Sequence, residues 1–200
     1  EQLDLCYTPA RTLARRIASG ELSPVELVDA VIERAEKLQP SLNFMAVPRF
    51  ERAREEARQA AEAVAGGAQL GPLHGIPITI KDNIPTAGDL FTSGSHACEN
   101  LVASGDQLAA ARLKAAGAIV IAKTTLPELA HKMLTDSPKY GITRNPWSLR
   151  HTPGGSSGGA PGAMPARHRR IGPSAMRARR GLRRAPRLAE DRRWQREAAE

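Results

Sequence analysis

The sequence predicts an α/β fold in which helices cover a sheet, and two observations lead to this prediction. Along residues 1–160, helical patterns with capping residues alternate with short apolar runs. The run Ala118-Ile119-Val120-Ile121-Ala122 is continuously apolar, which is typical of a strand buried on both faces of a parallel sheet. Alternation of this kind implies that the helices lie against the sheet.

Three helices are expected before the first strand. Thr8-Pro9 is an N-cap and N1 pair for a short helix, and Gly20 can end it. Residues 23–26, Ser-Pro-Val-Glu, form a capping box with proline at N1, and apolar residues then recur at helical spacing. A third helix, rich in Ala, Glu and Arg, is expected over residues 49–65, where a Gly-Gly pair follows.

The next segments alternate between strand and helix. Residues 76–80 read as a short buried strand that leads directly into Lys81. Asp106 can cap a helix that Gly117 closes. The apolar strand described above follows, and a further helix is then expected over residues 125–134.

Two domains of different composition are expected, residues 1–160 and residues 161–200. The first holds 17 basic and 17 acidic side chains, so the whole net charge of +8 lies in the second. Of those last 40 residues, 27 are Arg, Ala, Pro or Gly, and this composition predicts a disordered tail. A basic arm that binds nucleic acid is the alternative. The tail has no Lys, Phe or Tyr, which argues against that partner.

The sequence argues against a membrane partner, a metal site and a disulfide framework. The chain has no run of 18 apolar residues, which argues against a membrane partner. Cys6 and Cys98 have neither metal-ligand spacing nor the numbers for a disulfide framework. We therefore expect a reduced, cytoplasmic setting, with no metal ion and no cofactor.

Lys81 is the first residue with chemical promise. It ends an apolar strand that glycine and proline turns precede. Burial there would lower the pKa of the amine and let its neutral form accept a proton. Taken alone, however, Lys81 is better explained as a lysine that reaches solvent or pairs with Asp82.

A second segment with chemical promise places paired serines between glycines. Its central residues are Gly154, Gly155, Ser156, Ser157 and Gly158. Glycine permits backbone conformations that other residues avoid, and it lets N–H groups approach a ligand closely. Such a loop could hold an anion or a developing oxyanion. Taken alone, it is better explained as a flexible linker.

In combination, these segments resemble the amidase signature family. The resemblance rests on four stretches that follow the order of the family: Gly71–Asn83, Lys123–Ala130, Tyr140–Trp147 and Thr152–Gly159. Lys81 and Ser156 are 75 residues apart, a spacing typical of family members. The resemblance covers most of residues 8–160 and implies the amidase-signature fold, with a mixed sheet covered by helices.

Family members cleave or transfer the acyl groups of amides with a Ser–cis-Ser–Lys triad. The resemblance implies that Lys81 is the general base and that Ser156 is the middle serine, held by a cis peptide bond. Gly154, Gly155, Ser157 and Gly158 would support the loop. A small-molecule amide is the implied substrate, without a cofactor, and a homodimer of the full-length parent is left open.

The nucleophile of the family is missing from the chain. It lies some two dozen residues beyond the middle serine in a Gly-Thr-Asp-x-Gly-Gly-Ser segment, which here would fall near Arg180. No Gly-Gly-Ser occurs there, and Ser174 lies in a different context. An Arg/Ala/Pro/Gly tail is what GC-rich DNA encodes when it is read out of frame. We hypothesise a frameshift near codon 160, which would leave a truncated, inactive and poorly soluble copy.

The sequence leaves alternatives for function. A general amidase and an A-type amidotransferase subunit, which takes part in the amidation of aminoacyl-tRNA, are not separated by residues 1–160. The identity of the amide is open as well, because the substrate pocket of the family draws on later segments. A non-catalytic protein that binds nucleic acid through residues 161–200 ranks behind both.

Overall fold

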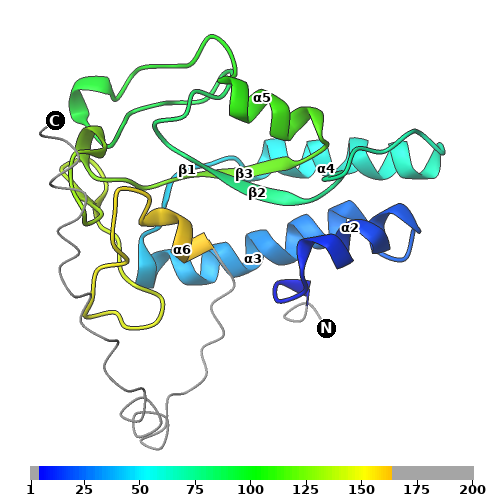
Figure 1. Ribbon diagram of the computed structural model, residues 1–200, viewed down its shortest axis with the longest axis horizontal. Coiled ribbons are helices and arrows are strands. Elements are labelled where there is room, and N and C mark those ends of the chain that lie inside the picture. The colour runs from blue at the N-terminus through cyan, green and yellow to red at the C-terminus, as the bar shows by residue number, and fades with distance from the viewer. Residues whose placement is uncertain (1–4, 164–200) are drawn as a thin grey trace, which may run out of the picture. The chain divides into compact units, whose positions relative to one another are not determined.

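A three-stranded sheet with helices on both faces organises the chain in the computed structural model, which describes residues 5–163 (Figure 1). The strands are β1 (Met45–Pro48), β2 (Pro77–Lys81) and β3 (Ile119–Thr124). The central strand, β3, pairs in parallel with β2 and antiparallel with β1. The prediction of a mixed sheet covered by helices is confirmed, although β1 was not among the predicted strands.

Three helices precede β2, as predicted: α2 (Ala10–Ala18), α3 (Pro24–Leu42) and α4 (Phe50–Ala65). At the start of α3, the Ser23 hydroxyl accepts a hydrogen bond from the Val25 N–H at 3.2 Å, and Pro24 is the first helical residue. The start of α2 differs from the prediction. Pro9 itself is the N-cap there, and it offers no side-chain acceptor.

The helix before β3, α5 (Leu108–Ala115), begins later than predicted. Its cap is Gln107, not Asp106. The Asp106 carboxylate instead accepts hydrogen bonds from the Ala87 N–H and from Lys114 Nζ, both at 2.8 Å. The side chain that was predicted to cap the helix is therefore bound by Ala87 and Lys114 instead.

The core lies on both faces of β3, all of whose residues are buried. Ile119 and Ile121 belong to a cluster with apolar side chains of α3 and α4. Val120 points the other way and packs with Ala110 of α5 and Ile80 of β2. The predicted apolar strand of a parallel sheet is confirmed, and Figure 1 shows α3 and α5 on opposite sides of the strands.

The predicted helix over residues 125–134 is wrong. Only Glu128–Ala130 forms a single 3-10 turn, and its last two residues have φ of 51° and 58°. A right-handed helix cannot continue through such angles. The Leu129 N–H donates to the Ser93 carbonyl at 2.8 Å, so tertiary contacts replace the helical hydrogen bonds here.

Three short elements complete the described part: β4 (Asp136–Ser137), β5 (Gly141–Ile142) and α6 (Gly159–Ala163). Strands β4 and β5 form an antiparallel hairpin. Helix α6 takes in residues 161–163 of the predicted tail, and the rest of that tail lies outside the described residues. No helix within residues 5–163 has the length and apolar character needed to cross a bilayer.

Candidate active site

Lys81 is the last residue of β2, opposite Thr124 at the end of the parallel strand β3. Its Nζ donates a hydrogen bond to Ser156 Oγ at 2.7 Å, although 75 residues separate the two in the sequence. The neighbouring Asp82 is not its partner. The Asp82 carboxylate accepts hydrogen bonds from Thr92, from the N–H at 3.2 Å and from Oγ1 at 2.7 Å.

The environment of Lys81 shifts the pKa of its side chain. Burial lowers the pKa of its amine below the ordinary value for lysine, because removal from water disfavours the charged form. None of the ion pairs found within residues 5–163 involves Lys81, so no carboxylate there opposes this effect. A lowered pKa makes the neutral amine, the form that can accept a proton, easier to reach.

Ser156 lies in the glycine-rich loop between β5 and α6. The peptide bond that joins Gly155 to Ser156 is cis, as the resemblance implies for this serine. Gly154 has φ of 90°, in a region that L side chains rarely adopt. Ser156 is partly buried and meets the Lys81 amine, so the structure brings together the two residues that the sequence singled out.

The loop is packed closely against the segment before β4. A Cβ on Gly155 would lie 2.8 Å from the Leu134 nitrogen. A Cβ on Gly158 would lie 2.0 Å from Thr135 Oγ1. Both contacts are too short for any side chain, so these positions require glycine for packing reasons.

Ser157 behaves differently from its neighbour. It is exposed, and its hydroxyl makes no hydrogen bond with the part of the chain that the structure describes. Only its carbonyl is engaged, by the Ala160 N–H at 3.1 Å. Within residues 5–163, Ser157 thus contributes to the loop through its backbone and not through its hydroxyl.

Sequence reasoning missed Thr135, which contacts both ends of the loop. Its hydroxyl donates to the Gly154 carbonyl at 2.9 Å and accepts from the Gly158 N–H at 3.0 Å. Thr135 directly follows the segment that was wrongly predicted to be helical. No local pattern marked it, because its partners lie about twenty residues further along the chain.

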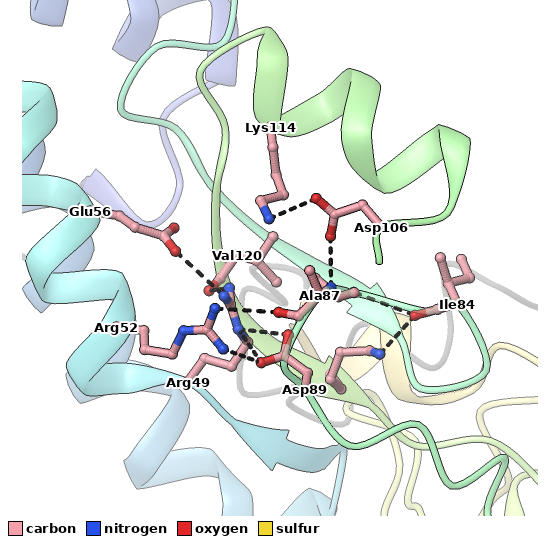
Figure 2. Close-up of polar contacts among 11 residues, drawn as sticks. Arg49, Arg52, Glu56, Ile84, Ala87, Asp89, Asp106, Lys114 and Val120 are labelled. Carbon is pink, nitrogen blue, oxygen red and sulfur yellow. Dashed lines mark hydrogen bonds and ion pairs between the residues drawn. The ribbon is translucent and has the colours of Figure 1, made fainter. Parts of the chain in front are cut away.

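A separate buried network of charges supports the segment that follows Lys81 (Figure 2). Arg49 Nε contacts both carboxylate oxygens of Asp89, at 2.8 and 2.9 Å, and Arg49 Nη1 donates to the Val120 carbonyl at 2.7 Å. Arg52 Nη1 also contacts Asp89, at 2.8 Å. These contacts join the start of α4 and the start of β3 to the segment after β2.

Lys123 is a second lysine near the strand ends, and unlike the partly buried Lys81 it is fully buried. Its Nζ donates to the Ile84 carbonyl at 2.7 Å. Burial lowers its pKa, against the opposing effect of the Asp82 and Asp89 charges. With its amine bound to a backbone carbonyl, Lys123 is a structural residue, unlike Lys81.

Two other features add no chemistry to the site. Within residues 5–163, no three His, Cys, Asp or Glu side chains lie close enough together to hold a metal ion. A mainly apolar cavity of about 360 Å³ lies between α2 and α3, with Leu13, Leu27 and Leu38 in its lining. Neither Lys81 nor Ser156 lines that cavity.

The chain is similar to amidases and to a related amidotransferase subunit. The profile of the family described as "Amidase" matches residues 26–171. The chain is 43% identical over 163 residues to the putative amidase AmiB2 of Mycobacterium tuberculosis, covering 82% of this chain and 35% of the relative. It is 41% identical over 152 residues to the A subunit of a glutamyl-tRNA(Gln) amidotransferase from Synechococcus, covering 76% of this chain and 31% of the relative.

Solved structures agree with the sequence relatives. The native peptide amidase from Stenotrophomonas maltophilia superposes with a TM-score of 0.71 at 34% identity, over 76% of this chain and 32% of that one. The chain thus spans about a third of the length of the proteins that it matches.

Proposed function

The chain belongs to the amidase signature family, and from this membership we propose that the enzyme it derives from hydrolyses the carbon–nitrogen bond of amides through Lys81, Ser156 and a further serine. The observation that supports this most is the 2.7 Å contact between Lys81 Nζ and Ser156 Oγ. Residues 75 positions apart meet at hydrogen-bond distance, and burial lowers the pKa of the amine.

In the proposed reaction, the neutral Lys81 amine accepts the proton of the Ser156 hydroxyl. Ser156 at the same time takes the proton of the nucleophilic serine, whose oxygen attacks the amide carbonyl. The protons then return along the same path to the leaving nitrogen. The C–N bond breaks, and an acyl-enzyme remains. Water, activated by the same pair, hydrolyses the ester and restores the serine.

The 200-residue chain itself is proposed to be inactive. Ser174 is the only serine after Ser157, and no Gly-Gly-Ser segment follows. Loss of a nucleophile removes the covalent step, and members of a catalytic triad act as a unit. We propose that a frameshift near codon 160 separates this chain from an active parent. If no alternative reading frame beyond that codon encodes a Gly-Gly-Ser segment, the frameshift is excluded.

Amide hydrolysis by two purified proteins tests the proposal. The 200-residue chain is expected to release ammonia or amine from a panel of amides no faster than buffer does. The protein encoded by the corrected frame is expected to hydrolyse at least one of them. The Lys81→Ala variant of that protein should then lose about 10²–10⁴-fold in kcat/KM, because it lacks its general base.

Two outcomes would contradict the proposal. Hydrolysis by the 200-residue chain that disappears in its Lys81→Ala variant would show that the missing serine is not needed. Full activity of the corrected-frame protein after the same substitution would remove Lys81 from the mechanism.

An A-type amidotransferase subunit is the alternative within the same family. The chain is about as similar to such a protein, at 41% identity, as to a putative amidase, at 43%. The two functions differ in the acyl acceptor and in the need for a partner protein. A gene for such a partner beside this one, and activity that depends on its product, would favour the amidotransferase.

A further inference from the structure

Thr135 joins the two ends of the loop that carries Ser156. Thr135 is only 2% exposed. Its hydroxyl lies between Gly154 and Gly158, each of which is two positions from Ser156 in the sequence. The hydroxyl donates to the Gly154 carbonyl at 2.9 Å and accepts from the Gly158 N–H at 3.0 Å. A hydroxyl has one proton to donate and lone pairs to accept with, so a single orientation satisfies both hydrogen bonds.

The loop has little freedom to move relative to Thr135. A Cβ on Gly158 would lie 2.0 Å from Thr135 Oγ1 and 2.6 Å from Thr135 Cβ. On the other side of Ser156, the backbone of Gly155 approaches the Leu134 nitrogen, where a Cβ would lie at 2.8 Å. The glycines on both sides of Ser156 therefore pack against Leu134 and Thr135.

Thr135 is in turn tied to the core of the molecule. The Thr143 N–H donates to the Thr135 carbonyl at 2.9 Å, across the β4–β5 hairpin. The Thr143 hydroxyl donates to the Asn43 carbonyl at 2.7 Å, at the end of α3. A chain of hydrogen bonds thus connects α3 to the loop, and Thr135 is its last member.

We propose that Thr135 is a positioning residue, whose hydroxyl fixes the loop so that Ser156 Oγ stays at hydrogen-bond distance from the Lys81 amine. The catalytic importance of that contact rests on the proposed function, whereas the contact itself does not. Valine has the shape of threonine but can neither donate nor accept a hydrogen bond. It would leave the Gly154 carbonyl and the Gly158 N–H without this partner.

The proposal gives Thr135 an effect on proton transfer although it touches neither reacting group. Transfer between Ser156 and Lys81 needs a donor–acceptor distance of about 2.6–3.2 Å. The observed distance of 2.7 Å lies near the short end of that range. A shift of the loop beyond this range would break the contact and make the Lys81 amine more accessible to water.

NMR spectroscopy of the 200-residue chain tests the proposal through two readouts. One is the nuclear Overhauser effect between the Lys81 ε-methylene and the Ser156 β-methylene. The other is the titration midpoint of the Lys81 ε-carbon. Thr135→Val is expected to lose the first signal and to move the midpoint upward, because burial is what lowers the Lys81 pKa. Thr135→Ser keeps the hydroxyl and should preserve both readouts.

Thr86→Val is the matched control. Thr86 is fully buried like Thr135, but within the described part of the chain its hydroxyl makes a single long contact, 3.4 Å from the Ile84 carbonyl. Its replacement should leave both Lys81 readouts unchanged. Should Thr135→Val fail to fold, Thr135→Ala takes its place in the same comparison with the serine variant.

A folded Thr135→Val chain that keeps both Lys81 readouts of the wild type would overturn the inference. Loss of both in the serine variant as well would also overturn it, because the hydroxyl would not be the group that matters. Failure of the proposed function looks different. In that case the Lys81–Ser156 contact depends on Thr135 as expected, but the corrected-frame protein hydrolyses no amide.

Discussion

Replacement of Asp89 by asparagine is expected to lower the free energy of unfolding by about 3–5 kcal/mol, the usual cost of breaking a buried ion pair from one side. Asp89 and Arg49 are only 5% and 4% exposed. The Asp89 carboxylate contacts Arg49 Nε at 2.8 Å and Arg52 Nη1 at 2.8 Å (Figure 2). Without it, the Arg49 guanidinium stays buried, and Glu56, at 3.4 Å, is its one remaining acidic partner among residues 5–163.

Glu99→Gln is the matched control for this prediction. Glu99 also contacts two side chains, His96 and Lys139, but it lies on the surface. Its loss should barely change the midpoint of urea unfolding, because water and salt screen exposed pairs. Both variants can be followed by circular dichroism. Equal shifts for the two would show that burial of the Asp89 pair contributes nothing to stability.

Gly158→Ala is expected to destabilise the chain by about 1–3 kcal/mol, the typical cost of overpacking a closed site. The new Cβ would meet Thr135 Oγ1 at 2.0 Å and the Gly154 carbonyl oxygen at 2.7 Å. Neither group can retreat easily, since one belongs to a buried side chain and the other to the backbone. Relief of the clash must shift the loop and, with it, Ser156.

Gly105→Ala is the control for the glycine variant. Nothing lies within 4 Å of a Cβ on Gly105, and its φ lies outside the left-handed region. Alanine there should be neutral or stabilising by about 0.4–1 kcal/mol, because it restricts the unfolded chain. Urea unfolding of the two variants gives the comparison. If Gly158→Ala is as stable as Gly105→Ala, the loop is not packed as described.

Local signals in the sequence were enough for most of the fold. The Ser23 cap, the Pro24 start and the apolar run of β3 each act within a few residues, so they could be recognised directly. The helix expected over residues 125–134 failed because Leu129 binds the Ser93 carbonyl, a contact that no local pattern encodes. The Asp106 cap failed for the same reason, since Ala87 and Lys114 hold its carboxylate.

Some residues of the candidate site could likewise be predicted from the sequence, and others could not. Lys81 and Ser156 could be selected in advance because a strand end and a glycine-rich loop are visible in the sequence, and the family resemblance joined them. Thr135 could not be selected, because its importance arises only when the loop folds back onto it. The exposure of the Ser157 side chain could not be predicted either, because it too depends on how the loop folds.

Titration of the Lys81 ε-carbon in the folded and the urea-unfolded chain most directly tests whether this lysine is prepared to act as a base. A Lys81→Arg variant identifies the signal and separates it from that of buried Lys123. The midpoint should be lower in the folded chain, because burial lowers the pKa of the amine beside Ser156. Equal midpoints in the two states would mean an ordinary ammonium group at this position and would contradict the proposed role of Lys81.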